Sequence, residues 1–307
     1  MPISNLNFVV SLITEDSDYQ REQAAAAKEA ADRLKVNVRI CYAENDAIKQ
    51  NQQLFEVIQN PSSGVNAIIV EPAGSTALPQ VARAAVDAGL GWVLLNRDDA
   101  SLSELVQRSK NPVFAVTANQ EETGRILGQQ LRALVPTGGD VLCIQGPTSN
   151  PVSAQRLDGM NDTKPENVTF KLLRSPYWTE AAGFQTVNSW LRLSTSQHGE
   201  YAAVVAQSDL IALGARRAFQ ELANTNVRDR WLSLPFLGVN GLKVGQNAVK
   251  SRMLASTVAI PPSTVPAIEL LVQAYRGGQP APRLTFVRPS SYPSLDVLSP
   301  ASVVSRP

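Results

Sequence analysis

The fold class of this chain is decided by residues 202–215, AAVVAQSDLIALGA. The first five of these residues are continuously apolar, which is typical of a strand covered on both faces of a parallel sheet. Three polar residues follow, Gln207, Ser208 and Asp209. Apolar residues then repeat at helical spacing, at Ile211, Ala215, Ala218 and Leu222. The stretch therefore predicts a strand that passes through a short polar loop into a helix.

The same unit recurs on both sides of this stretch. Short apolar runs rich in Val, Ile and Leu occupy residues 8–13, 36–41, 67–70, 92–95, 114–117, 141–144, 202–206 and 236–239. Amphipathic segments of helical period lie between them. This alternation predicts an α/β fold with parallel sheets and right-handed crossovers. The 307 residues exceed what one doubly wound domain usually needs, so we expect two lobes of about 150 residues each.

Composition excludes several classes of function. The 28 basic and 27 acidic residues leave a net charge of +1, without the basic surplus of a nucleic-acid-binding protein. The single histidine, His198, argues against histidine-based metal sites and catalytic triads. Dinucleotide, P-loop and nucleophile-elbow motifs are also absent from the sequence. We therefore expect neither an enzyme nor a cofactor.

Polar side chains follow the predicted strands, where ligands bind in open parallel sheets. They include Asn96 and Arg97 after one strand, Ser208 after another and Asn240 after a third. Serines and aspartates at such positions, among them Ser208 and Asp209, could simply cap helices. Arginine is a poor cap and a fork-shaped donor, so Arg97 and Arg156 are stronger candidates for ligand contact.

The chain from Leu6 onward resembles the type I periplasmic binding proteins of the ribose-binding group, which share their fold with LacI-type effector domains. Residues 204–215 are similar to the family's strand, N-D pair and A-x-G-A helix. Residues 236–241, FLGVNG, resemble its G-F-D-G strand end, and Leu95-Asn96-Arg97 resembles its D-R. Residues 255–258, ASTV, resemble the strand that leads to a lobe crossing.

This resemblance implies two doubly wound parallel-sheet lobes joined by three crossings that act as a hinge. The expected amino-terminal lobe comprises residues 1–118 and 260–288, and the expected carboxy-terminal lobe comprises residues 119–259 and 289–307. The resemblance also implies the ligand-binding residues, which are Tyr19, Asn96, Arg97, Arg156, Trp178, Ser208 and Asn240. Alternatives stay open: Tyr19 could staple the first helix, Trp178 could be a surface aromatic, and Arg156 could pair with Asp158 or Asp162.

The departures from the family pattern bear on the ligand. Asn96 and Asn240 stand where the family has aspartates, Ser208 replaces an asparagine, and Ile260 stands near a glutamine position. The matched positions thus keep two arginines and lose two acids, although Asp98 or Asp209 could compensate. We therefore expect a sugar other than ribose, a polyol, or a ligand with a negative group such as a sugar acid, because an unpaired arginine in a closed cleft is costly.

The resemblance implies a monomeric solute-binding receptor that closes on a sugar-like ligand and works with an ABC permease or a sensor membrane protein. No nucleic-acid partner is expected. The start at Met1 lacks a signal-peptide pattern, so we expect either a periplasmic protein whose signal is absent from this chain or a cytoplasmic one. The alternative function is a cytoplasmic ligand-sensing module of the LacI type without a DNA-binding domain.

Overall fold

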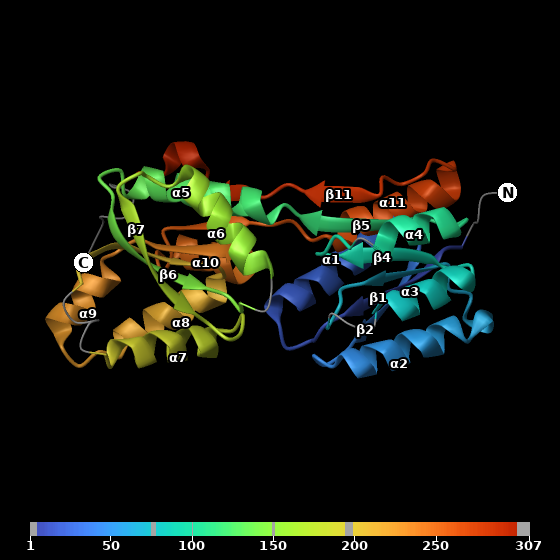
Figure 1. Cartoon of the computed structure of the whole chain (residues 1–307), viewed down its shortest axis with the longest axis horizontal. Coiled ribbons are helices and arrows are strands. Elements are labelled where there is room, and N and C mark those ends of the chain that lie inside the picture. Colours follow the sequence, from blue (N-terminus) through green and yellow to red (C-terminus); the bar gives the residue numbers. More distant parts are fainter. Residues whose placement is uncertain (1–4, 75–77, 100, 149–150, 194–198, 300–307) are drawn as a thin grey trace. The chain divides into compact units, whose positions relative to one another are not determined.

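The computed structural model describes residues 5–74, 78–99, 101–148, 151–193 and 199–299, so His198 lies outside the described residues. The chain divides into two compact units (Figure 1). The amino-terminal unit comprises Met1–Ala118 and Pro261–Val287, and the carboxy-terminal unit comprises Asn119–Ile260 and Arg288–Pro307. The chain therefore passes between the units three times.

The amino-terminal unit is built on a sheet with strand order β11-β5-β4-β3-β1-β2, in which all paired strands are parallel. The central strands are fully buried, which explains their continuous apolar sequence. The strands are β1 (Asn7–Leu12), β2 (Asn37–Tyr42), β3 (Ala67–Val70), β4 (Gly91–Leu95), β5 (Val113–Ala118) and β11 (Leu284–Val287).

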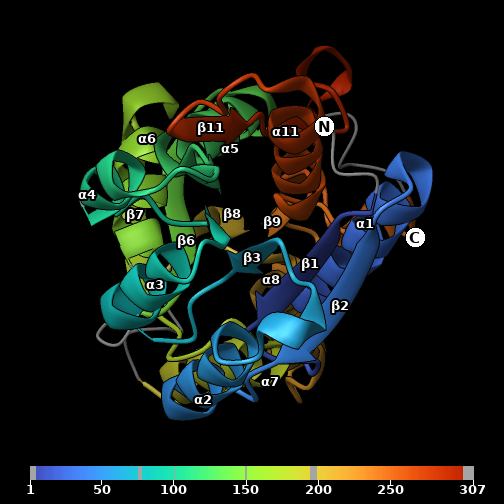
Figure 2. The same cartoon turned by 90° about the vertical axis from the view of Figure 1, so that its right-hand side faces the viewer.

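Helices cover both faces of this sheet. Helix α1 packs beside α11 on one face, while α2, α3 and α4 follow one another on the other (Figure 2). Ile68, Val70, Trp92, Leu94 and Ala115 belong to a core cluster together with apolar residues of α2, α3 and α4. The helices are α1 (Asp18–Leu34), α2 (Ala47–Ile58), α3 (Leu78–Asp87), α4 (Ser101–Arg108) and α11 (Thr264–Gly277), with a 3-10 turn η1 (Pro61–Ser63).

The carboxy-terminal unit repeats this design with strand order β12-β10-β9-β8-β6-β7. Its strands are parallel except β12, which runs antiparallel to β10 at one edge. The strands are β6 (Gly139–Gln145), β7 (Val168–Arg174), β8 (Tyr201–Ala206), β9 (Phe236–Asn240), β10 (Ser256–Ala259) and β12 (Ser290–Tyr292).

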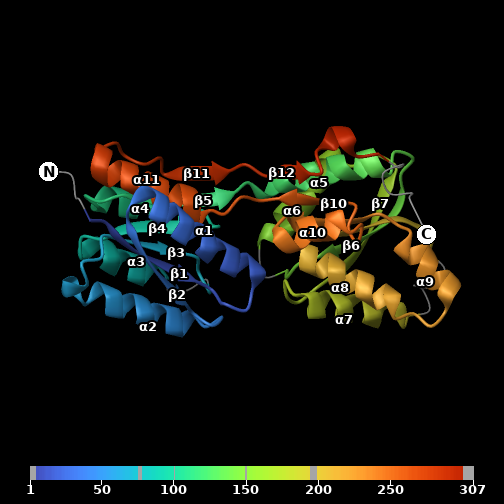
Figure 3. The same cartoon turned by 180° about the vertical axis from the view of Figure 1, so that it is seen from behind.

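The helices of this unit pack in pairs, α5 with α6 and α7 with α8 (Figure 3). Gly159 lies so close to α5 that a Cβ there would approach the Glu121 carbonyl oxygen to 1.9 Å, so only glycine permits this contact. The helices are α5 (Gln120–Leu134), α6 (Pro151–Thr163), α7 (Glu180–Leu191), α8 (Asp209–Gln220), α9 (Thr225–Leu232) and α10 (Lys243–Lys250), with a 3-10 turn η3 (Leu295–Val297).

The predicted α/β class with two doubly wound sheets is confirmed. The exception is the antiparallel β12, which departs from the expected parallel arrangement. The apolar runs did not reveal β7 and β11: polar and exposed residues interrupt β7, and β11 has only four residues, of which Val287 alone is buried. No helix in the described part of the chain is long and apolar enough to span a membrane.

Candidate ligand-binding residues

Three candidate residues of the amino-terminal unit lie after strands that end at the same edge of its sheet. Strands β1 and β3 pair from Phe8 opposite Ala67 to Ser11 opposite Val70, and β3 pairs in turn with β4. Tyr19 follows β1 at the start of α1, and Asn96 and Arg97 follow β4. All three side chains are partly exposed, so a ligand at this edge could reach them.

Tyr19 and Asn96 are joined by a hydrogen bond. The Asn96 amide nitrogen donates to the Tyr19 hydroxyl at 2.8 Å, and the Asn96 amide oxygen accepts from the Ser263 hydroxyl at 2.8 Å. Asn96 has a positive φ of 56°, a conformation in which asparagine is favoured. The loop conformation and the hydrogen bonds together fix the position of this side chain.

Arg97 is held more loosely than its neighbours. One guanidinium nitrogen donates to the Gly74 carbonyl oxygen at 3.3 Å. The following Asp98 does not compensate for the aspartate expected at position 96, because it forms an exposed bidentate ion pair with Arg283 at 2.8 and 3.1 Å. Arg97 is therefore available for a ligand at little cost to the fold.

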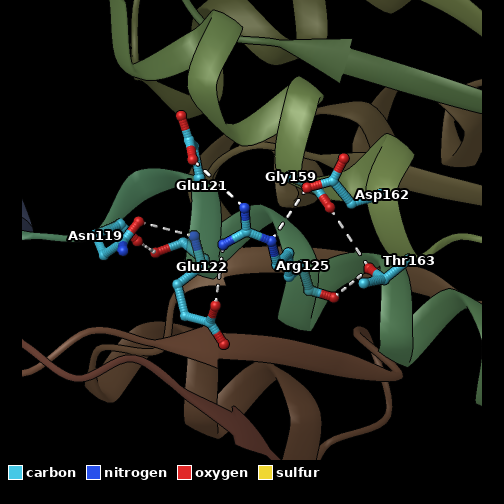
Figure 4. Close-up of polar contacts among 8 residues, drawn as sticks. Asn119, Glu121, Glu122, Arg125, Gly159, Asp162 and Thr163 are labelled. Carbon is cyan, nitrogen blue, oxygen red and sulfur yellow. Dashed lines mark hydrogen bonds and ion pairs between the residues drawn. The ribbon is translucent and has the colours of Figure 1, made fainter.

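Arg156 of the carboxy-terminal unit is buried and firmly bound. Only 6% of it is exposed, and it donates to the Gln120 side-chain oxygen at 2.8 Å and to the Gln207 carbonyl oxygen at 2.6 Å. Asp162, one of the alternative partners, instead accepts from Arg125 at 3.1 Å, in a cluster that joins α5 to α6 (Figure 4). These hydrogen bonds fix the Arg156 side chain at the strand-end region of this unit.

Trp178 lies against Arg156 rather than alone on the surface. The guanidinium carbon of Arg156 is 5.5 Å from the centre of the Trp178 ring, within the range of a cation–π interaction. The ring also covers Gly146, where a Cβ would approach it to 2.0 Å. The indole is partly exposed, so it presents an apolar face of the kind that packs on sugar C–H groups.

Ser208 occupies the N-cap position of α8, but its hydroxyl does not cap the helix. The side chain is 1% exposed, and its oxygen has no hydrogen-bond partner among the residues that the structure describes. Buried hydroxyls normally have a partner. This geometry favours a ligand contact over the capping role that we considered from the sequence.

Asn240 ends β9 with a φ of 111°, and the next residue, Gly241, has a φ of 58°. Asp209 fixes this turn: its two carboxylate oxygens accept from the Gly241 amide at 2.8 Å and from the Thr257 hydroxyl at 2.6 Å. Burial raises the pKa of Asp209 to about 7, although these hydrogen bonds and the charge of Arg156 lower it. Asp209 therefore positions Asn240 through the backbone.

The two candidate arginines each have an acid of their own unit nearby, although no acid stands at the predicted ligand positions themselves. Glu71, which directly follows β3, is a buried carboxylate close enough to Arg97 for that charge to lower its pKa. Asp209 has the same relation to Arg156. Both arginines therefore have an acid within their own unit.

Sequence reasoning missed three residues that organise these positions. Glu71 lies against Asn96, and the Gln120 side chain accepts a hydrogen bond from Arg156. The Gln207 side chain accepts from the Gly146 amide, just after β6, and donates to the Ser153 carbonyl oxygen of α6. Position alone could have identified Glu71, since it is the first residue after an apolar run. Nothing in the sequence indicated Gln120 as the partner of Arg156.

Several curated proteins are similar in sequence. A D-ribose/D-allose-binding protein of Pseudomonas aeruginosa is 29% identical over 192 residues, covering 62% of this chain and 57% of the relative. A D-apiose import binding protein of Actinobacillus succinogenes is 22% identical over 272 residues, covering 87% and 81%. A ribose import binding protein of Escherichia coli is 25% identical, covering 78% and 74%. The matches span only 58% and 57% of two of the curated relatives.

Solved structures share the fold. An ABC transporter periplasmic solute-binding protein of Actinobacillus succinogenes with bound D-allose superimposes with a TM-score of 0.80 at 19% identity, covering 97% of this chain and 99% of that one. The model of the periplasmic binding protein domain matches residues 8–279. That family is named for binding, which agrees with the prediction that the chain is not an enzyme. The predicted resemblance is confirmed, and the chain belongs to the periplasmic binding protein domain family.

Proposed function

We propose that this protein is a solute-binding receptor that closes on one uncharged sugar or polyol and delivers it to an ABC importer. The observation that carries the proposal is the buried hydroxyl of Ser208, which lacks a partner in the described structure and lies at a strand end beside Asp209. Sugars supply hydroxyl partners for such groups and C–H faces for Trp178. We propose that Tyr19, Asn96, Arg97, Arg156, Trp178, Ser208 and Asn240 contribute to this binding.

The names of the relatives support a small polyhydroxy ligand. They include proteins named for binding ribose, allose, apiose and xylitol, and several are named as import binding proteins. These names favour import over the LacI-type regulator module. We further propose that the receptor acts as a monomer in the periplasm, with a membrane permease as its partner.

A thermal-shift screen across neutral sugars, polyols and sugar acids tests this proposal. A ligand at a hundred times its Kd adds about 2.7 kcal/mol of stability, which raises the Tm of units of this size by several degrees. We expect the shift from a neutral compound. If no compound of the panel shifts the Tm of the folded protein, the receptor function is wrong.

A further inference from the structure

Glu71 is a buried acid at the strand-end edge of the amino-terminal unit, and it is not one of the proposed ligand-binding residues. It follows β3 directly and is 8% exposed. One carboxylate oxygen accepts from the Gln20 side-chain amide at 2.9 Å. Burial raises the pKa of Glu71, while hydrogen bonds from Gln20 and Asn96 and the charge of Arg97 oppose that rise.

The hydrogen bonds around Glu71 require it to act as an acceptor. The side-chain oxygen of Gln20 accepts from the Ile13 amide at 2.9 Å, so the nitrogen of Gln20 must face Glu71. The oxygen of Asn96 accepts from Ser263, so the nitrogen of Asn96 is the atom that faces Tyr19 and Glu71. Two amide donors directed at one carboxyl group match its ionised form.

An aspartate at position 96 would conflict with this arrangement. A carboxylate there would face the buried Glu71 instead of donating to it, and two like charges in contact raise the pKa of one of them. A carboxylate would also reverse the hydrogen bond to Tyr19, whose hydroxyl would then have to donate instead of accepting. Asparagine is therefore the residue that fits beside Glu71, and the family's acid at this position has a substitute one strand away.

We propose that Glu71 is the specificity-determining acid of the amino-terminal unit: it takes the place of an acid at position 96, orients Asn96 and Tyr19, and disfavours anionic ligands. This inference rests on the proposed function and deepens it, because it assigns selection for uncharged polyhydroxy compounds to one residue. Glu71 acts as a positioning residue for Asn96 and, in its ionised form, as a negative charge toward the ligand.

A charge-swap cycle tests the proposal without any ligand. Asn96→Asp should lower the Tm because two carboxylates then meet, and adding Glu71→Gln should restore most of the loss. The exposed Glu56 of α2 provides the matched control, because Glu56→Gln removes an acid from the same unit away from this cluster. If the double variant is no more stable than Asn96→Asp alone, the proposal is overturned.

Calorimetry with D-ribose, D-allose and xylitol, each against its corresponding sugar acid, provides the second readout. We expect the wild type to prefer the neutral compound at least about tenfold, and Glu71→Gln to reduce that preference by about tenfold, the effect of one pKa unit of interaction. Asn96→Asp should weaken neutral binding about tenfold, and the double variant should recover it to within about threefold.

The outcomes separate the two proposals. A purely structural role for Glu71 would weaken neutral and acidic compounds equally and leave their ratio unchanged, which overturns the specificity role. A wild type that prefers the sugar acids overturns it as well. If no neutral compound binds, the proposed function fails, while the Tm cycle still decides whether Glu71 takes the place of the acid at position 96.

Discussion

Arg97 after β4 and Arg156 within α6 are the candidate ligand-binding arginines of the two units, yet the structure binds them very differently. Arg156 is almost fully buried, donates to Gln120 and to a backbone carbonyl, and lies against Trp178. Arg97 is partly exposed and has one long hydrogen bond to the Gly74 carbonyl. The arginine of the carboxy-terminal unit is thus fixed by the surrounding structure, whereas the arginine of the amino-terminal unit can change its conformation more easily.

The acids of the two units differ in a related way. Glu71 accepts hydrogen bonds from side-chain amides, so it fixes the positions of other side chains. Asp209 accepts hydrogen bonds from a backbone amide and a threonine hydroxyl, so it fixes the backbone of the turn at Asn240 and Gly241. In the amino-terminal unit the candidate residues are therefore positioned by side-chain hydrogen bonds, and in the carboxy-terminal unit Asn240 is positioned by the backbone.

Replacing each arginine in turn should give the largest difference in stability between the two units. Arg156→Ala removes two charge-assisted hydrogen bonds, each worth roughly 1.5–3 kcal/mol, and leaves buried acceptors unpaired. We expect a loss of about 3–5 kcal/mol in the free energy of unfolding, measured by chemical denaturation.

Arg97→Ala is the matched variant for the other unit. It should cost less than about 1 kcal/mol in stability, because the one hydrogen bond of Arg97 is long and partly exposed. Both variants should lose the thermal shift produced by ligand. Equal stability losses in the two variants would contradict the assignment of Arg156 as a structural residue, and a retained ligand shift in Arg156→Ala would contradict its assignment to the site.

Asp209 should make the stability of the protein depend on pH. Burial raises its pKa from an ordinary 3.8 to about 7, so the folded state keeps a proton that the unfolded state releases between these values. The free energy of unfolding should therefore fall as pH rises from about 4 to 7 and level off above. The upper limit is about 4 kcal/mol, at about 1.4 kcal/mol per pKa unit, and we expect roughly half.

Asp209→Asn isolates this effect from Glu71, whose raised pKa acts in the same direction. The asparagine can still accept from the Gly241 amide and donate to the Thr257 hydroxyl, so the turn should persist. Denaturation curves from pH 4 to 8 should show a flatter profile for the variant than for the wild type. Profiles of identical slope would mean that Asp209 ionises normally.

The fold could be predicted because buried parallel strands are apolar on both faces. Strands β3, β4 and β5 are fully buried and read as unbroken apolar runs. In β7, exposed polar residues such as Lys171 and Arg174 interrupt that pattern, and β11 has only four residues, of which Val287 alone is buried. The antiparallel β12 has three residues, too few for any periodicity to appear.

The candidate site was only partly predictable. Strand ends identify which residues reach the sheet edge, which is why Asn96, Arg97 and Ser208 became candidates from the sequence. They do not show which polar groups already have partners within the protein. From the loss of acids at positions 96 and 240 we did not foresee that Glu71 lies near Arg97. Charge balance at a site depends on contacts between strands, and these contacts follow from the strand order, which one sequence does not specify.

The smallest expected effect on stability, and the sharpest on binding, concerns the Ser208 hydroxyl. Ser208→Ala removes a buried oxygen without a partner in the described structure, so the free energy of unfolding should stay constant or rise by up to about 1 kcal/mol. Ligand affinity in calorimetry should fall about fivefold to tenfold, the loss of one hydrogen bond.

Ser256 of β10 offers the control for this prediction, because its hydroxyl is also buried without a partner among the described residues but lies within a strand. Ser256→Ala should have the same small effect on stability and none on ligand affinity. A pair of variants with equal affinities would show that Ser208 does not touch the ligand. A destabilised Ser208→Ala would show that its hydroxyl is already bound within the protein, in which case the carboxy-terminal unit would rely on Arg156, Trp178 and Asn240 for binding.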